Sequence, residues 1–261
     1  MSEPLLKIEG LSVTVYEGGR AKNIVNGIDL EVQKLGIVAL VGGSGSGKTT
    51  TGLAILRLLQ PGVSISGGQI HFEGVDLLKL PKEKMRQLRG SSISMVFQEP
   101  LDAFNPVFSI GYQINEVLLF HTQLNSQQRR ERLYELLDLV GLPEPKQLAK
   151  SYPHQLSGGM RQRAMIAQAI AANPKLMIAD EPTSNLDVTL QAKIMELFNK
   201  LRNELNLSIL LITHDLGMVE HMADRIVVMR SGEVVEAEAT RMIVEKPKHE
   251  YTRQLIKAFQ V

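Results

Sequence analysis

The sequence contains no cysteine among its 261 residues, and its six histidines are scattered along the chain. The absence of cysteine excludes disulfides, iron–sulfur clusters and cysteine-ligated zinc, and it fits a reducing compartment. So few histidines argue against a transition-metal site in this chain. No apolar run approaches the roughly 18 residues needed to span a bilayer, and the first residues show no basic segment followed by a long apolar stretch. We therefore expect a soluble chain without a secretory signal.

The sequence also lacks any large excess of one charge. Lys and Arg number 29 against 28 Asp and Glu, so the net charge is +1. Bulk electrostatics therefore do not require DNA or an anionic membrane as a partner. The 44% of hydrophobic and 22% of charged residues are typical of a soluble globular protein. The chain is long enough for one large domain or two modest ones.

Strand and helix patterns alternate along most of the chain. Alternating apolar and polar residues predict antiparallel strands at 5–16 and 27–32, an edge pair at 67–77 and a hairpin at 224–237. Continuous apolar runs predict buried strands at 36–42, 92–98, 175–182 and 207–215. Helical spacing marks 49–60, 155–174 and 188–205, and residues 100–155 show helical periodicity without a clear strand. This alternation predicts an α/β fold with a mostly parallel sheet.

A glycine-rich loop lies between a predicted buried strand and a predicted helix. Residues 42–49 read GGSGSGKT and fit G-x-x-x-x-G-K-[ST]. Backbone N–H groups of such a loop surround phosphate oxygens, Lys48 would reach the β- and γ-phosphates, and Thr49 would ligate Mg²⁺. A flexible linker is the alternative, but the strand–loop–helix context favours a nucleotide site. The candidate ATP-binding residues are Gly42, Gly43, Ser44, Gly45, Ser46, Gly47, Lys48, Thr49 and Thr50.

Two adjacent carboxylates follow another predicted buried strand, in KLMIADEP at 175–182. Ligands of parallel sheets collect at the carboxyl ends of strands. Asp180 would hold Mg²⁺ through its water shell, and Glu181 would polarise the attacking water. A solvated acidic turn is the alternative interpretation. The phosphate loop in the same chain makes this alternative the weaker one.

A phosphate loop alone leaves kinases, GTPases, helicases and transport ATPases open. LSGGMRQR at 156–163 places a second glycine pair before a helix, which by itself could be only a helix cap. Together with five further motifs, however, it makes the sequence resemble the ATP-binding cassette (ABC) ATPases over essentially the whole chain. These motifs are GGSGSGKT (42–49), VFQEP (96–100), LMIADEP (176–182), SNLD (184–187) and ITHD (212–215), and they follow the family's order.

The resemblance implies a single ABC ATPase domain over residues 1–261. Its fold would be a P-loop NTPase (RecA-like) core with a mostly parallel sheet, an N-terminal antiparallel β subdomain and an α-helical subdomain. The core with the β subdomain would occupy about 1–99 and 156–240, the helical subdomain about 100–155, and a C-terminal helical tail 241–261.

The resemblance also implies that two cassettes pair head to tail around ATP. The signature residues Ser157, Gly158, Gly159 and Gln162 would contact ATP held by the partner, and Asp187 would lie in an interface loop. Gln98 would sense Mg²⁺ and water, His214 would hydrogen-bond the γ-phosphate, and Tyr16 would stack on adenine, although relatives often carry that aromatic at the position of Val15. The implied catalytic residues are Glu181, His214, Gln98 and Lys48, and the implied Mg²⁺ ligands are Thr49, Gln98 and Asp180.

Several segments resemble the oligopeptide/dipeptide/nickel importer branch, among them KPKHEYTRQLIKAF at 246–259. Gly43 stands where peptide-type members usually carry Glu, so we prefer nickel or a metal chelate over peptide as cargo. The branch implies an ATP-hydrolysing subunit at the cytoplasmic face of the membrane. Its partners would be a second ABC ATPase, identical or homologous, two transmembrane permeases and an extracytoplasmic binding protein, with no nucleic acid. The alternatives are a soluble ABC ATPase acting on nucleic acid or ribosomes, and a regulatory nucleotide-binding module.

Overall fold

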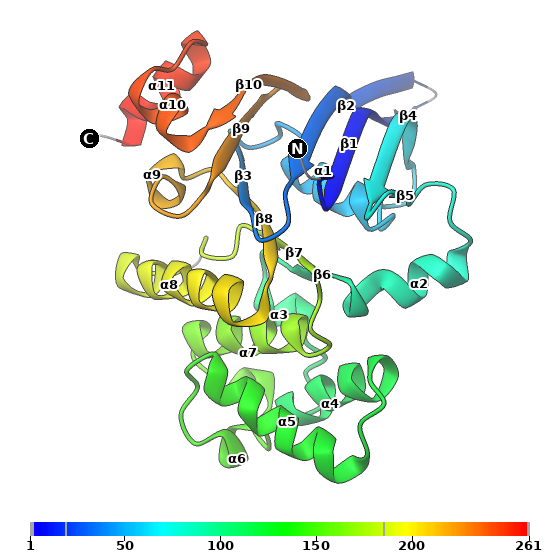
Figure 1. Ribbon diagram of the computed structural model, residues 1–261, viewed down its shortest axis with the longest axis vertical. Helices are drawn as coiled ribbons and strands as arrows, with labels where there is room; N and C mark the ends of the chain where they lie inside the picture. The colour runs from blue at the N-terminus through cyan, green and yellow to red at the C-terminus, as the bar shows by residue number, and fades with distance from the viewer. Residues whose placement is uncertain (1–2, 19, 185, 260–261) are drawn as a thin grey trace. The chain divides into compact units, whose positions relative to one another are not determined.

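The computed structural model describes residues 3–18, 20–184 and 186–259 (Figure 1). It contains two compact units: unit 1 is formed by residues 1–85 and 207–261, and unit 2 by residues 86–206. These units do not test the predicted subdomain boundaries, which stay predictions. Within the described ranges, no helix combines the length and apolar character needed to cross a membrane.

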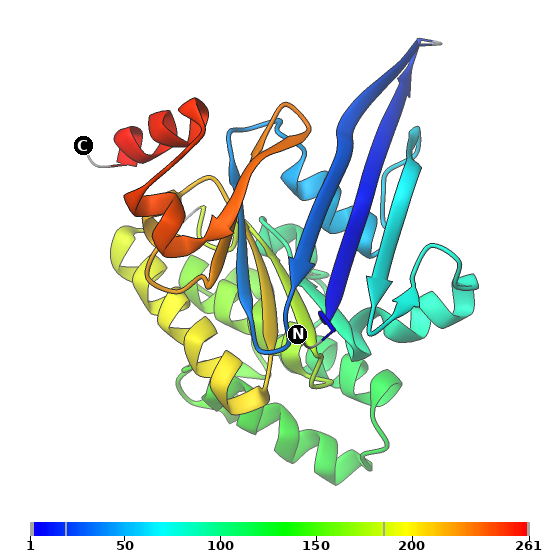
Figure 2. The same ribbon diagram turned by 45° about the horizontal axis from the view of Figure 1, so that its top comes forward.

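Unit 1 begins with an antiparallel sheet whose strands lie in the order β2-β1-β4-β5. Figure 2 shows the three long strands of this sheet side by side. The strands are β1 (Leu6–Glu17), β2 (Arg20–Val32), β4 (Val63–Phe72) and β5 (Val75–Asp76). The first hairpin and the edge pair are therefore as predicted. Strand β2 starts seven residues earlier than its apolar pattern indicates, because pairing with β1 (Val15 opposite Lys22) keeps this polar segment extended.

Unit 1 also contains four strands in the order β10-β9-β3-β8. They are β3 (Ile37–Gly42), β8 (Ser208–Thr213), β9 (Arg225–Arg230) and β10 (Glu233–Ala239). Strand β3 pairs in parallel with β8 and β9, and all of its six residues are buried. Asp224 fixes the start of β3, since its carboxylate accepts from the N–H of Ile37 at 2.7 Å and its own N–H donates to the Ile37 carbonyl at 2.8 Å.

Four helices of unit 1 follow or connect these strands: α1 (Lys48–Ile55), α9 (Leu216–Val219), α10 (Thr240–Glu245) and α11 (Glu250–Phe259). In Figure 1, α10 and α11 follow β10 at the C-terminal end of the chain. Helix α1 ends five residues before the predicted Gln60. The reason is Arg57, whose φ of 53° is left-handed and whose guanidinium donates to the carbonyls of Leu77 and Leu80 at 3.2 and 2.7 Å.

Unit 2 combines two parallel strands with helices. Strands β6 (Ile93–Val96) and β7 (Leu176–Asp180) pair from Ile93 opposite Leu176 to Val96 opposite Ala179. The helices are α3 (Pro100–Ala103), α4 (Ile110–His121), α5 (Ser126–Leu139), α6 (Pro145–Leu148), the 3-10 helix η1 (Pro153–Gln155), α7 (Gly158–Ile170) and α8 (Val188–Leu205). Helix α2 (Lys82–Ser91) crosses the boundary between the units. The stretch from 100 to 155 is helical, as its periodicity predicts.

Side-chain caps explain where α4 and α5, the two longest helices of residues 100–155, begin. The Ser109 hydroxyl accepts from the N–H of Tyr112 at 3.2 Å at the start of α4. Asn125 and Gln128 form a reciprocal capping box at the start of α5, with distances of 3.0 and 2.9 Å. These caps satisfy N–H groups that have no partner within a helix.

Candidate active site

The glycine-rich loop joins the carboxyl end of β3 to the N-terminus of α1, as its motif predicts. Gly47 is the N-cap of α1 and has a φ of 99°, in the left-handed region that favours glycine. A Cβ atom at Gly47 would also lie 2.9 Å from the carbonyl oxygen of Ile24. The loop conformation therefore depends on glycine at this position, and it leads the chain directly into the first turn of α1.

Lys48 begins α1 and turns back over the loop. Its side chain is only 5% exposed, and its Nζ donates to the carbonyls of Gly42 and Gly43 at 2.8 and 3.0 Å. The neighbouring Thr49 is exposed at the surface. A buried ammonium held by neutral carbonyls, at a positively polarised helix end, is arranged to receive phosphate oxygens.

His214 leaves its strand at the same sheet edge as the phosphate loop. Strands β3 and β8 are parallel neighbours, with Val41 opposite Thr213, so the residues that follow both strands lie at one carboxyl edge. His214 is exposed there, and the next residue, Asp215, caps α9 by accepting from the N–H of Met218 at 3.0 Å. Tyr16 lies near the end of β1 in the same unit, and its side chain is 58% exposed, as an adenine-stacking ring would need to be.

In unit 2, the structure brings together Gln98 and Glu181. Strands β6 and β7 end side by side, and Gln98 Nε2 donates to Glu181 Oε2 at 3.3 Å. Asp180 is the last residue of β7 and only 3% exposed. Glu181 has a φ of 43°, a left-handed conformation that costs a residue with a side chain about 1–2 kcal/mol. This strain turns Glu181 away from the strand direction immediately after Asp180, and such strain clusters at functional sites.

The signature residues lie at the N-terminus of α7 in unit 2. Ser157 is the N-cap, and its hydroxyl accepts from the N–H of Met160 at 3.3 Å. Ser157 and Gly158 are exposed, whereas Gly159 is buried and a Cβ there would lie 3.2 Å from Leu190 Cδ1. Gln162 is only 2% exposed, so its side chain faces the interior of unit 2. The contact predicted between Gln162 and partner-bound ATP stays a prediction, and this burial argues against a direct contact.

Asp187 caps the next helix of unit 2. Its carboxylate accepts from the N–H of Leu190 at 3.0 Å at the start of α8, and the residue is exposed. The cap satisfies a helix N–H group and leaves the residue available at the surface. Of the SNLD motif that contains it, Asn185 lies outside the described residues.

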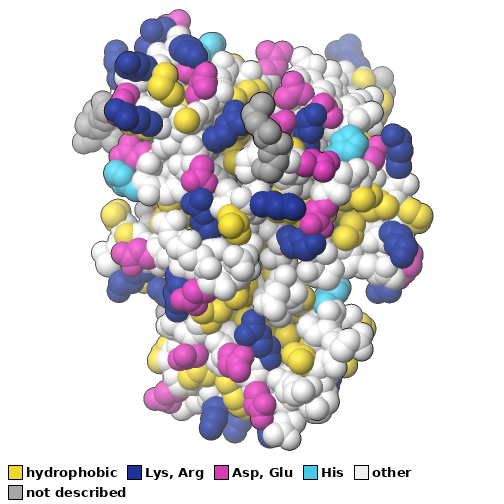
Figure 3. All heavy atoms as spheres, in the orientation of Figure 1, with side chains coloured by type: hydrophobic (Ala, Val, Ile, Leu, Met, Phe, Trp, Pro, Cys, Tyr) yellow, Lys and Arg dark blue, Asp and Glu magenta, His cyan; other side chains and the backbone are white. Residues whose placement is uncertain are grey.

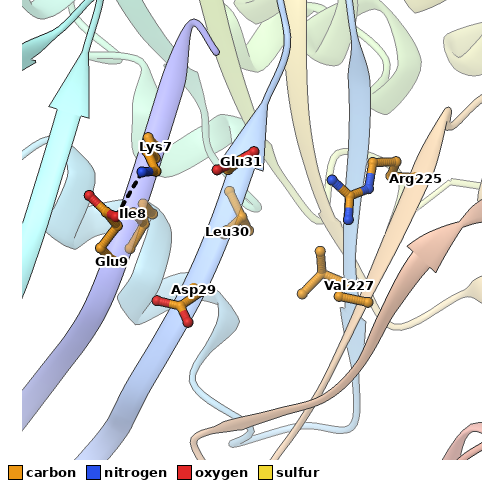
Figure 4. Close-up of a pocket in the computed structure, with 9 residues that line it drawn as sticks. Lys7, Ile8, Glu9, Asp29, Leu30, Glu31, Arg225 and Val227 are labelled. Atoms are coloured by element: carbon orange, nitrogen blue, oxygen red, sulfur yellow. Dashed lines mark ion pairs between the residues drawn. The ribbon is translucent and has the colours of Figure 1, made fainter. Parts of the chain in front are cut away.

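A cavity of about 410 Å³ on unit 1 lies away from the phosphate loop (Figure 4). Arg225 contributes to it from the first residue of β9, whereas the phosphate loop follows the last residue of β3 at the other end of this parallel pair. The figure shows Lys7 and Glu9 paired on β1, at 2.7 Å, beside Asp29 and Glu31 of β2. These carboxylates would repel phosphate, so this cavity is no part of the nucleotide site.

The strand–loop–helix with a buried lysine, and the carboxylate pair at a parallel strand end, define a nucleotide-binding α/β ATPase. Comparison with known families identifies the branch: residues 25–184, more than half of the chain, match the family described as ABC transporter. The chain belongs to the ABC transporter family, and it is a cassette ATPase of that family. The predicted fold class, the family resemblance and ATP as the nucleotide are thereby confirmed.

Curated relatives match the chain almost from end to end. The peptidoglycan transport ATP-binding protein YejF of Agrobacterium fabrum is 46% identical over 98% of this chain, which spans about half (47%) of that relative's length. The oligopeptide transport ATP-binding protein AppD of Bacillus subtilis is also 46% identical, over 98% of this chain and 79% of its own length. These relatives are transport proteins, which favours the transport prediction over a soluble ATPase acting on nucleic acid or ribosomes. Their names refer to peptidoglycan and oligopeptides and lend no support to the preference for nickel.

Solved structures of cassettes share the fold. The dimeric post-hydrolysis state of the cassette MJ0796 bound to ADP and Pi has a TM-score of 0.81 and 29% identity, covering 90% of this chain and 99% of its own. The cbiO1 subunit of the cbiONQ transporter complex of Clostridium perfringens has a TM-score of 0.79 and 27% identity, covering 94% of this chain and 93% of its own.

One residue at the phosphate loop was missed by the sequence analysis. Tyr251 of α11 contacts Gly43, and the two residues are 208 positions apart. The tail segment 246–259 and Gly43 both stand out in the sequence, but each was used only to choose a branch of the family. No local pattern links them.

Proposed function

We propose that this chain is the ATP-hydrolysing subunit of an importer of peptides. The observation that carries the chemistry is the Gln98–Glu181 contact at the end of β7, next to the buried Asp180. The peptide cargo is supported by the oligopeptide relative, which matches 98% of this chain. As a peripheral protein, the chain would be held at the cytoplasmic face of the membrane by two permease subunits, which take peptide from an extracytoplasmic binding protein.

In this proposal the residues of unit 1 hold the nucleotide. N–H groups of the loop between residues 44 and 50 surround the β-phosphate, Lys48 exchanges its two carbonyl partners for phosphate oxygens, and Tyr16 stacks on the adenine. His214 donates to the γ-phosphate from the end of β8. Phosphoryl transfer requires positioning and charge neutralisation more than covalent chemistry, and these residues supply both.

The residues of unit 2 act on the attacking water. Glu181 accepts the proton of the water. Gln98 contacts the Glu181 carboxylate and orients the water. Thr49, Gln98 and Asp180 offer hydroxyl, amide and carboxylate oxygens, the donor set that Mg²⁺ prefers, so we assign them to the ion. When bound, Mg²⁺ would neutralise charge on the β- and γ-phosphate oxygens.

A second cassette, identical or homologous, would complete the site. Ser157 and Gly158 are exposed at the N-terminus of the 13-residue helix α7, where N–H groups favour an anion. We propose that this helix end binds the γ-phosphate of ATP held by the partner cassette. The solved MJ0796 cassette, which shares this fold, is described as dimeric, and that supports the proposal.

Removing the Glu181 carboxylate tests the chemistry. Glu181→Gln keeps the size of the side chain but cannot accept a proton, so ATP turnover should fall by roughly 100- to 10,000-fold while ATP binding persists. Phosphate release and isothermal titration measure the two quantities on the full chain. Glu196→Gln, an exposed carboxylate on α8, is the matched control and should keep both. Turnover within a few-fold of wild type in Glu181→Gln would show that Glu181 is not the base.

The cargo is tested in the assembled transporter. The chain is co-expressed with its candidate permeases, purified with them and reconstituted into vesicles with the binding protein. Stimulation of ATP hydrolysis by a peptide mixture, and not by Ni²⁺ or a nickel chelate, is the expected result. Stimulation by nickel alone would replace the peptide proposal with the nickel one.

A further inference from the structure

The hydroxyl of Tyr251 lies against the phosphate loop. The N–H of Gly43 donates to Tyr251 Oη at 2.9 Å. Tyr251 belongs to α11, near the C-terminal end of the chain, and none of the chemistry proposed above uses it. This N–H belongs to the second residue of the loop.

Gly43 is held from its other side by the lysine of the site. Its carbonyl accepts from Lys48 Nζ at 3.0 Å, and the same ammonium donates to the carbonyl of Gly42 at 2.8 Å. One residue of the loop therefore connects the Tyr251 hydroxyl with the ammonium assigned to the phosphates. A displacement of Gly43 would displace the carbonyl that orients Lys48.

Several contacts within unit 1 fix the Tyr251 side chain. The Arg230 guanidinium lies over the ring, 4.9 Å from its centroid. The N–H of Tyr251 donates to His249 Nδ1 at 3.1 Å. The preceding backbone is held by Glu236, whose carboxylate accepts from the N–H groups of Lys248 and His249 at 2.8 and 3.0 Å. The hydroxyl is therefore presented to the loop by a fixed ring on a fixed segment.

The absence of a side chain at Gly43 makes this contact possible. A Cβ atom built there would lie 3.1 Å from Tyr251 Oη, which is tighter than ordinary van der Waals contact. Apart from the two chain neighbours of Gly43, no other heavy atom of the described residues lies within 4 Å of it. Gly43, which we took as a mark of nickel-type relatives, thus has a packing reason inside this chain. The contact between Tyr251 of the C-terminal segment and the phosphate loop therefore depends on glycine at position 43.

We propose that Tyr251 is a positioning residue for the phosphate loop, through which the C-terminal segment 246–259 sets the affinity for ATP. The inference rests on the proposed nucleotide site. Tyr251 acts on the nucleotide only through Gly43 and Lys48, and its ring can remain on Arg230 when the hydroxyl is removed.

The test is a double-mutant cycle on ATP affinity, measured by isothermal titration on the full chain. Tyr251→Phe removes one hydrogen bond and should weaken ATP binding roughly 2- to 10-fold. Gly43→Ala pushes a methyl group against the hydroxyl and should weaken binding by a similar factor. In the double variant the methyl group meets no hydroxyl, so adding Gly43→Ala to Tyr251→Phe should cause no further loss. Tyr134→Phe on α5 of unit 2 is the matched control.

The outcomes separate the inference from the proposed function. If the wild-type chain fails to bind ATP, the proposed function fails. If wild type binds ATP but Tyr251→Phe binds equally well, or if the two losses multiply in the double variant, the role of Tyr251 is wrong. The melting temperatures of wild type, the two single variants and the double variant show whether a substitution destabilises the whole chain. General destabilisation would lower the melting temperature but would not make the two effects on ATP affinity non-additive.

Discussion

The buried carboxylate of Glu236 offers a quantitative test of how the C-terminal segment is held. Glu236 is 8% exposed on β10 and accepts from the N–H groups of Lys248 and His249. In Glu236→Gln only one side-chain oxygen remains, and the new amide group faces a backbone N–H donor. Losing one charge-assisted hydrogen bond and leaving one N–H without a partner costs about 2–3 kcal/mol.

This cost should appear as local opening of the segment rather than as global unfolding, because a terminal segment can detach while the sheet stays intact. Hydrogen exchange at the amides of Lys248 and His249 measures it directly. We expect exchange of these two amides to be about 30- to 150-fold faster in Glu236→Gln, because a cost of about 2–3 kcal/mol corresponds to that ratio of rates. Glu238→Gln is the matched control on the same strand. Its carboxylate pairs with the exposed Lys248 side chain at 2.8 Å, and such an exposed ion pair contributes little, so little change is expected.

The same site predicts a dependence on pH. Burial raises the pKa of Glu236, but the nearby Thr252 side chain and the hydrogen bonds from the N–H groups of Lys248 and His249 outweigh it, and the net pKa is lowered. A lowered folded-state pKa stabilises the docked segment above the unfolded pKa of about 4.3, and this stabilisation is lost as the pH falls through the folded value. Wild type should therefore lose protection of these amides below about pH 4, and Glu236→Gln should lack that step. Equal protection and equal pH dependence in both proteins would refute this account of the segment.

Two further substitutions test the caps of the site. Gly47→Ala forces a φ of 99° on a residue with a side chain and places its Cβ 2.9 Å from the Ile24 carbonyl oxygen. ATP binding, measured by titration, should therefore be lost, and thermal melting should show a destabilisation of about 2–3 kcal/mol. Asp187→Ala removes the α8 cap and should lower the free energy of unfolding by about 1 kcal/mol, whereas Asp187→Ser should keep most of that stability. Equal melting temperatures for the Ala and Ser variants would contradict a capping role.

Charge on the surface agrees with the composition. On the face shown in Figure 3, positive and negative side chains are interspersed. On this face, neither sign of charge forms a region of its own.

The buried strands were predictable from sequence because a strand covered on both faces must be apolar throughout. Every residue of β3, β7 and β8 is buried, and these strands are apolar except at their ends, where β7 has Asp180 and β8 has Ser208 and Thr213. Within unit 1, the residues that follow β3 and β8 could therefore be assigned to one edge of a parallel sheet. The phosphate loop and His214 follow these two strands at that edge, and in unit 2 Asp180 is the last residue of β7.

Other features carry no local signal. Helix α2 is almost entirely polar, with Met85 as its one buried residue, so its sequence shows no apolar face. The left-handed backbone of Glu181 could not be predicted, because a carboxylate has no preference for that conformation. The contact between Tyr251 and Gly43 depends on how the tail folds back over unit 1, and neither residue type implies the other.

The first glycine of the phosphate motif is required by the neighbouring strand. Gly42 lies opposite Met229, and a Cβ atom at Gly42 would overlap the Met229 carbonyl oxygen. This demand comes from strand packing and holds whether or not a nucleotide is ever bound. A descendant of this chain that lost ATP hydrolysis would no longer need the charge of Lys48 for phosphate but would still need Gly42. Searches for active cassettes should therefore give weight to the lysine and little to this glycine.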